Sequence, residues 1–402
     1  MTRKLAIALV VAAVVLGGAV GWSVAAMDHH AKPSGRSGES TTPSHTVTPI
    51  SAPTSPASPS FKVHGFTVGP RWFLTALQHA PDSKTPTTSL ELISPSGATH
   101  TVFTSPGAMA LSAWSGDGRH ALIQGQLQPN SRQSNEVVDL TTGAVIPMTL
   151  PLHGDETTIV GFTRPSGREM WVVNFSNSVG TLQRVSFNGG NPVTLATNVT
   201  LGAAVVPTAD GQALFVPSNN QIELVSNKGA GKPTLLGDSL GCAPVRLWST
   251  TELLTQCGET SAAAQGRGEL ELMSLRRVGL QLLALDTTFP LAINQVAYAA
   301  GGRAYTNTQG GSCARGWISR VGARGSISPL ASTRSNRNDH IVASDGTNLA
   351  ILVNDSTCVR FAPNWTLKWM NPKTGTTRTV FTARTRMEPP LLPFPTANGV
   401  ES

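Results

Sequence analysis

An Asp-Gly turn followed by a short apolar run recurs along this chain of 402 residues. The clearest copy is Trp114-Ser115-Gly116-Asp117-Gly118-Arg119, which runs into Ala121-Leu122-Ile123. Asp-Gly supplies the positive φ angles that a two-residue hairpin turn needs, and the apolar residues after it can pair back as a strand. Related turns lie around Gly69, Gly167, Gly211, Ser249, Gly302 and Gly346. Recurrence of this kind predicts a repeat fold rather than a single hairpin.

Each turn is followed by a second feature, an alternating strand that ends in a Gly-bearing turn. The glycines of these later turns are Gly97, Gly143, Gly189, Gly229, Gly279, Gly325 and Gly375. They recur about every 40 to 50 residues, which is the period of a four-stranded propeller blade. Aromatic residues make up only 5% of the chain, and Gly and Pro separate its short apolar runs, as in all-β proteins. We therefore expect a seven-bladed β-propeller over residues 61–386.

The turn at residues 114–119 also resembles a known repeat. It is similar to the Trp-Ser-Pro-Asp-Gly-Arg/Lys turn of TolB-like (WD40-like) β-propeller repeats, with Gly116 where Pro is usual. The later Leu-polar-Leu strand with its Gly turn matches the second half of that repeat, and the resemblance covers about residues 61–381. It implies the propeller fold. The α/β domain that precedes the propeller in TolB resembles nothing in this chain.

The N-terminus has the pattern of a signal anchor. Arg3 and Lys4 precede residues 5–27, which are uncharged and mostly apolar. At about 1.5 Å per residue, such a helix is long enough to cross a hydrocarbon core of roughly 30 Å. We expect a transmembrane segment over residues 1–30, or a signal peptide cleaved near Ser23-Val24-Ala25. The basic residues stay in the cytoplasm, so either alternative predicts an extracytoplasmic main domain.

Residues 31–60 are almost entirely Ser, Thr, Pro, Gly and Ala. This composition buries too little apolar surface to offset the entropy of ordering, so we expect a disordered linker that holds the propeller clear of the membrane. Residues 387–402 are expected to be a C-terminal tail. The whole chain is expected to be a monomer bound to the membrane through its N-terminal helix.

The cysteines all fall in the second half of the chain, at Cys242, Cys257, Cys313 and Cys358. An extracytoplasmic location favours disulfides, and four cysteines allow three ways of pairing. Cys242 and Cys257 flank a predicted hairpin and would lie opposite each other. The other two follow equivalent turns of adjacent repeats. We predict the pairs Cys242–Cys257 and Cys313–Cys358; zinc binding is the alternative, without paired Cys-x-x-Cys or neighbouring His to support it.

Positive charge is concentrated near the C-terminus. The chain has a net charge of +7, and residues 301–386 hold twelve Lys and Arg against three Asp. If both turn families lie on one face of the propeller, the long loops between second and third strands lie on the other. These loops carry Lys84, Arg132, Arg267, Arg315 and Arg360. They predict a basic rim that binds an envelope protein or an anionic cell-wall polymer, with no role for Arg324 and Arg378 on the opposite turns. Nucleic acid is not an expected partner of an exported domain.

Motifs of catalysis are largely missing. Gly237-Asp238-Ser239-Leu240 spells the GDSL hydrolase motif, but neither its α/β/α context nor a later Asp-x-x-His is present, so we expect a turn. Asp117, Asp210 and Asp345 occupy equivalent turns and are expected to cap them; no cofactor or metal is expected. We therefore favour a non-catalytic binding or scaffold protein at the cell envelope. The alternative is a hydrolase, lyase or cyclase with its site at the mouth of the propeller channel, so enzymatic activity is left open.

Overall fold

The computed structural model describes most of the chain from Ser60 to Phe394 as β-structure. The described residues are 60–63, 65–79, 86–125, 134–150, 156–176, 179–190, 192–200, 204–229, 231–236, 239, 241–257, 269–275, 280–284, 292–310, 315–322, 325–330, 338–354, 365–383 and 386–394. The expected signal anchor and linker lie outside them. Among the described residues there is no helix long and apolar enough to cross a membrane.

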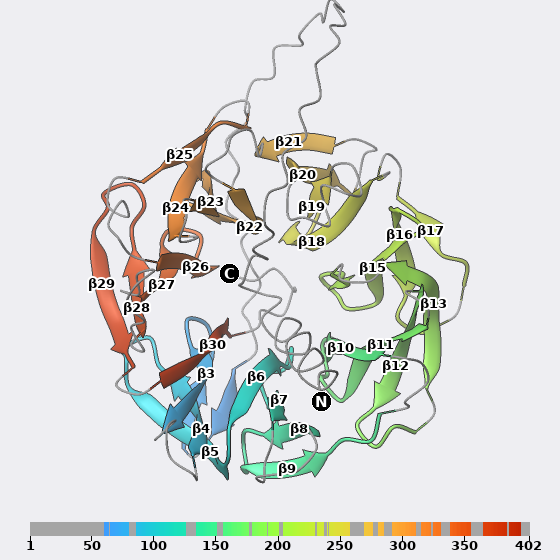
Figure 1. Ribbon diagram of the computed structural model, residues 1–402, viewed down its shortest axis with the longest axis horizontal. Helices are drawn as coiled ribbons and strands as arrows, with labels where there is room; N and C mark the ends of the chain where they lie inside the picture. The colour runs from blue at the N-terminus through green and yellow to red at the C-terminus, as the bar shows by residue number, and fades with distance from the viewer. Residues whose placement is uncertain are drawn as a thin grey trace, which may run out of the picture.

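The sheets are arranged in a ring, with their first strands nearest the centre and their last strands outside (Figure 1). Five sheets have four antiparallel strands each. One is β6 (Met109–Trp114), β7 (His120–Gly125), β8 (Ser134–Asp139) and β9 (Ala144–Pro147). Three more are β18 (Cys242–Ser249), β19 (Glu252–Cys257), β20 (Glu269–Ser274) and β21 (Leu280–Ala284); β22 (Ala292–Ala300), β23 (Arg303–Gly310), β24 (Arg315–Val321) and β25 (Ile327–Pro329); and β26 (Asn338–Ser344), β27 (Leu349–Asn354), β28 (Trp365–Met370) and β29 (Thr377–Thr382). The protein is therefore an all-β propeller.

The fifth four-stranded sheet joins the two ends of the chain. It consists of β30 (Arg386–Pro393), β3 (Phe73–His79), β4 (Thr87–Ile93) and β5 (Thr99–Pro106), in that order. The C-terminal strand β30 is thus the innermost strand of this sheet. From the repeat, with its turn around Gly69, one would expect a segment just before β3 in that position. The expected domain boundary at residue 386 falls at the first residue of this strand, so the propeller continues to Pro393.

The prediction of seven separate blades is wrong. Residues 156–235 form one eight-stranded sheet from β10 (Glu156–Phe162), β11 (Glu169–Ser176), β12 (Val179–Ser186), β13 (Val193–Thr200), β14 (Val206–Pro207), β15 (Ala213–Ser218), β16 (Gln221–Ser226) and β17 (Thr234–Leu235). This stretch contains two of the sequence repeats. They join because β14 is only two residues long and faces only Leu214 and Phe215 of β15. The far end of β15 therefore pairs with β13, through Val199 and Ser218.

Most turns of both families lie where the sequence predicts, whereas Gly279 lies outside the described residues and Gly69 precedes β3 without joining two strands of one sheet. In the sheet β6–β9, the turn with Gly118 joins the first two strands and the turn with Gly143 joins the last two, and both glycines have positive φ angles, 76° and 72°. In an antiparallel meander, the first and third connections lie at the same edge. We call the resulting face of the ring the turn face.

A separate hairpin, β1 (Phe61–Val63) and β2 (Phe66–Val68), precedes the ring. Phe61 is 4% exposed and stacks at 6.1 Å, between ring centroids, on Phe394, which follows β30. Trp114 meets the Phe394 ring edge-on at 5.3 Å. The two ends of the described chain therefore share one apolar core with the sheet β6–β9.

Candidate functional site

The structure does not describe the side chains of two sets of predicted residues, the basic rim and the second pair of cysteines. Lys84, Arg132, Arg267 and Arg360 of the basic rim are not among the described residues, and Arg315 is described only by its backbone, as the first residue of β24. Cys313 and Cys358 also lie outside. The basic rim and the second disulfide therefore stay predictions.

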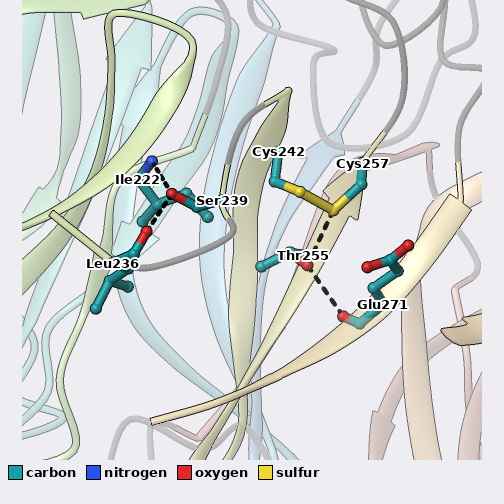
Figure 2. Close-up of a disulfide and its surroundings, with 7 residues drawn as sticks. All are labelled: Ile222, Leu236, Ser239, Cys242, Thr255, Cys257 and Glu271. Carbon is teal, nitrogen blue, oxygen red and sulfur yellow. Dashed lines mark hydrogen bonds between the residues drawn. A yellow bond between two sulfur atoms is a disulfide. The ribbon is translucent and has the colours of Figure 1, made fainter. Parts of the chain in front are cut away.

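The first predicted disulfide is confirmed. Cys242 and Cys257 lie directly opposite each other in β18 and β19, with their Cα atoms 4.0 Å apart, and are bonded (Figure 2). Both are buried. Thr255, on the same strand as Cys257, donates its hydroxyl to the carbonyl oxygen of Glu271 at 3.2 Å, which ties the bonded hairpin to β20. Burial, with Glu269 close by, raises the pKa of the Glu271 carboxyl.

Ser239, the serine of the GDSL motif, is a structural residue. Its side chain is fully buried, and its Oγ donates to the carbonyl oxygen of Leu236 at 2.6 Å (Figure 2). The same atom accepts the N–H of Ile222 at 3.0 Å. No His or Asp takes part in these bonds, so Ser239 fastens the segment before β18 to β16, as the turn interpretation predicts.

The turn aspartates cap their turns, as predicted. The Asp117 carboxylate accepts the Ser115 hydroxyl at 2.6 Å and the Arg119 N–H at 3.0 Å. Burial opposes ionisation of Asp117, but the hydrogen bonds from Ser115 and the Arg119 N–H, with the His120 imidazole 3.8 Å away, outweigh it, so its pKa is lowered. Asp210 caps its turn through the Thr208 hydroxyl and the Gln212 N–H. Ser115 donates its hydroxyl to Asp117 rather than to His120. Ser115, His120 and Asp117 are therefore not arranged as a nucleophile, its base and the carboxylate that orients the base.

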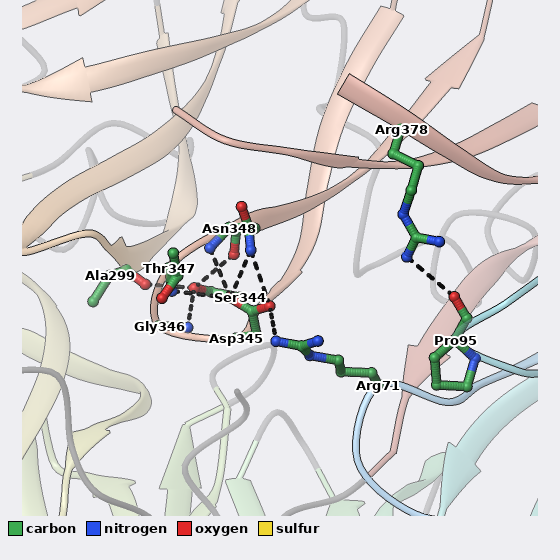
Figure 3. A network of polar contacts seen from close by, with 9 residues as sticks. All are labelled: Arg71, Pro95, Ala299, Ser344, Asp345, Gly346, Thr347, Asn348 and Arg378. Atoms are coloured by element: carbon green, nitrogen blue, oxygen red, sulfur yellow. Dashed lines mark hydrogen bonds and ion pairs between the residues drawn. The ribbon is translucent and has the colours of Figure 1, made fainter. Parts of the chain in front are cut away.

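Asp345 has a further partner. Its Oδ1 accepts the N–H groups of Thr347 and Asn348 at 2.9 and 2.7 Å, which is the capping that the sequence predicts. Its Oδ2 lies 2.7 Å from a guanidinium nitrogen of Arg71, which belongs to the other end of the chain (Figure 3). The Arg71 guanidinium also lies 5.9 Å from the ring of Trp369.

These contacts border a pocket of about 450 Å³ between the first and last sheets of the propeller. It is lined by Arg71, Asp345, Asn348, Trp369, Asn371, Thr376, Thr377 and Arg378. Arg71 immediately precedes Trp72 and β3, whereas the other residues come from the sheet β26–β29 and its turns. We call this the seam pocket. It lies on the turn face, because Arg71, Asp345 and Asn371 all belong to turns of that face.

Arg378 forms the second bridge across the seam. Its Nη2 donates to the carbonyl oxygen of Pro95, in the turn between β4 and β5, at 3.2 Å (Figure 3). Arg378 as a whole is exposed. Sequence reasoning placed Arg378 on the turn face correctly but gave it no role, because it could not show that the Pro95 turn and β29 are neighbours.

Other cations lie at turns of the same face. Lys373 lies over the neighbouring sheet, since a Cβ atom on Gly301 would be only 2.9 Å from its Cε. Arg303 and Arg320 flank Tyr305, where burial raises the pKa of the phenol and the two guanidinium charges act against that rise. Among the described side chains, part of the positive charge expected near the C-terminus therefore lies on this face, and the rim stays a prediction.

No metal site is seen: within the described ranges, no three His, Cys, Asp or Glu side chains are grouped so that they could hold an ion. The seam pocket contains a single carboxylate among its described lining residues, that of Asp345.

Comparison with known proteins shows no family for this chain. No protein-family model and no curated protein matches the sequence. Similar solved structures include the β-propeller domain of the Trilobed protease from Pyrococcus furiosus, at 11% identity over 81% of this chain and 97% of that one, with a TM-score of 0.49. Oligogalacturonate lyase from Vibrio parahaemolyticus has 11% identity over 79% and 88% of the two chains, with a TM-score of 0.46.

TolB from Acinetobacter baumannii is also among these structures, at 15% identity over 64% of this chain and 65% of that one, with a TM-score of 0.39. The propeller fold that the TolB-like resemblance implies is shown by the arrangement of the sheets themselves. Because every one of these TM-scores is below 0.5, no site or activity of these proteins is carried over to this chain.

Proposed function

We propose that this protein is an extracytoplasmic β-propeller, tethered by its N-terminal segment or released by cleavage, that binds a partner at the cell envelope without catalysis. The observation that supports it most is the seam pocket. Its charged groups are fixed by bonds within the fold, as recognition sites usually are. A general base or nucleophile needs an uncommitted lone pair, whereas Asp345 is held by Arg71 and two backbone N–H groups.

The location is supported by two independent features. The apolar segment after Arg3 and Lys4 directs the rest of the chain outside the cytoplasm. The buried Cys242–Cys257 bond is of the kind that persists in oxidising compartments. A membrane anchor, an extracytoplasmic domain and a binding role are mutually consistent.

Retention by the envelope tests the function. Full-length protein expressed in its native host should be degraded by protease added to intact cells, and should co-sediment with cell-wall material after the membrane is dissolved in detergent. The binding role would be wrong if the protein leaves the wall material entirely at low salt. Release of soluble fragments from that material on incubation with the protein would instead favour the enzyme alternative.

A further inference from the structure

The seam pocket contains two guanidinium groups that are only partly used. Arg71 is 55% exposed at its side chain and directs one nitrogen, Nη2, to Asp345. Arg378 directs Nη2 to the carbonyl oxygen of Pro95. A guanidinium has five N–H donors in a planar fork, so each side chain has further donors for a ligand in the pocket.

The charge of the pocket is positive. Arg71 and Arg378 contribute two positive charges, and Asp345 contributes one negative charge. Asp345 is only 9% exposed at its side chain and is already surrounded by donors, so an entering anion meets the guanidinium groups rather than the carboxylate. A ligand with one carboxylate or phosphate group would balance this site.

The remaining lining groups are neutral and polar. Thr376 and Thr377 bring hydroxyl groups, and Trp369 forms an apolar wall that is 8% exposed. Asn371 brings its amide nitrogen, since its Oδ1 already accepts two backbone N–H groups, and the Asn348 Nδ2 is directed to Asp345. Such groups suit hydroxyl groups on a ligand better than an aliphatic chain. A volume of about 450 Å³ lies in the range of small-molecule sites, roughly 300 to 1,000 Å³.

The backbone at Arg71 adds an independent observation. Its φ angle is 66°, in the left-handed region that residues other than Gly, Asn and Asp seldom adopt. This conformation places the guanidinium over Trp369 and against Asp345. Strained backbone of this kind is often found at ligand sites, where the surrounding structure maintains it.

We propose that the seam pocket binds a small hydroxylated oxyanion, held through its carboxylate or phosphate group by Arg71 and Arg378. This inference rests on the proposed binding function and names the class of ligand. Because Arg71 comes from the start of the propeller and Arg378 from its last sheet, the bound anion connects the two ends of the ring. Binding therefore raises the stability of the closed ring by mass action.

The test uses three ligands with the same three-carbon skeleton. Glycerate carries a carboxylate, glycerol 3-phosphate a phosphate, and glycerol neither. Binding to the detergent-solubilised full-length protein is measured by calorimetry, together with the thermal midpoint, at ligand concentrations up to about 10 mM, where millimolar affinities are visible. We expect at least one of the two anions to bind and to raise the midpoint, and glycerol to do neither. Which anion binds more tightly identifies the source of the negative charge.

Variants locate the site. Arg71→Gln and Arg378→Gln should each weaken anion binding by about tenfold, the size of one charged hydrogen bond. Arg168→Gln is the matched control, because Arg168 is an exposed arginine in a turn of the same face, on another sheet. If a Gln variant fails to fold, Arg378→Lys, which keeps the charge but loses the fork, should still bind more weakly than the native protein.

The inference is overturned if neither anion binds, if glycerol binds equally well, or if Arg168→Gln weakens binding as much as Arg378→Gln. Failure of the proposed function would look different. If the pocket binds an anion but the protein is not retained by cell-wall material, the ligand of the pocket is established and the envelope role is wrong. If Arg378→Gln is retained by cell-wall material as strongly as the native protein, the envelope role stands, but the seam pocket is not the site that binds the wall.

Discussion

Gly97 lies so close to the carbonyl oxygen of Val380 that a Cβ atom on the glycine would overlap that oxygen. The two residues belong to the first and last sheets of the propeller, Gly97 in the turn between β4 and β5 and Val380 in β29. The turn of one sheet thus rests directly on the backbone of the other. This contact adjoins the Arg378 bond to Pro95. Together with the pairing of β30 to β3, these contacts join the two ends of the ring, and we call them the closure.

Gly97→Ala is expected to destabilise the protein. Gly97 has a φ angle of 93°, which by itself costs a side chain about 1 kcal/mol or more. The overlap with Val380 adds a further loss, because backbone cannot move aside as a flexible side chain does. Urea unfolding followed by tryptophan fluorescence measures the change.

Gly65→Ala separates the two effects. Gly65 has nearly the same φ angle, 90°, but no heavy atom within 4 Å of the position of a Cβ atom. This variant should show the cost of backbone strain alone, so it should be the milder of the two. Equal losses would mean that the approach of Gly97 to Val380 does not contribute to ring closure.

Phe394→Ala is expected to weaken the closure from the other side. Phe394 is 3% exposed, and its ring contacts those of Phe61 and Trp114. Removing a buried phenyl ring from such a core typically costs about 3 to 5 kcal/mol. Val145→Ala, at a residue 38% exposed on β9, should change the unfolding free energy by less than about 0.5 kcal/mol. A Phe394 variant as stable as this control would contradict the shared core.

The repeat turns were predictable from sequence because each is a local feature. Asp117 needs only Ser115 and Arg119 to complete its cap, and the Gly118 conformation depends on adjacent residues. Even the Cys242–Cys257 pair lies within one hairpin. Local chemistry of this kind is readable along the chain.

The closure and the seam pocket were not predictable, because they join residues that are far apart in sequence. The sequence around Arg71 does not indicate which segment pairs with β3, and the partner is the C-terminal strand β30 rather than a segment that precedes β3. The eight-stranded sheet was missed for a related reason. It depends on how far β13 extends past its own hairpin to reach Ser218, and strand ends are not fixed by local pattern.

Removing the confirmed disulfide should lower stability without changing the fold. The bonded residues are 15 positions apart, for which loop-entropy estimates give about 3 kcal/mol, a model-dependent value. The Cys242→Ala, Cys257→Ala double variant should lose an amount of this order in urea unfolding under oxidising conditions. Any further loss when a reductant is added to this variant reports the predicted Cys313–Cys358 bond. Peptide mapping without reduction that joins Cys242 to Cys358 would contradict both pairs.

The last prediction concerns acid stability and rests on His340, in β26. Burial lowers the pKa of its imidazole to about 4, from a usual value of 6.5, and its ring lies 6.3 Å from that of Trp365. Because the unfolded chain binds a proton at higher pH than the folded protein does, stability falls as the pH drops from 6.5 towards 4. A difference of this size corresponds to a loss of about 1 to 3 kcal/mol across that window.

Urea unfolding at about pH 7 and about pH 4.5 measures this loss. His340→Gln removes the titrating group while keeping a polar side chain of similar length, so the variant should lose less stability between the two pH values than the native protein. The lowered pKa of Asp117 acts in the same direction but at lower pH, mainly below 3.8, and it is unchanged in the variant. If His340→Gln keeps the full pH dependence, the buried imidazole is not its source.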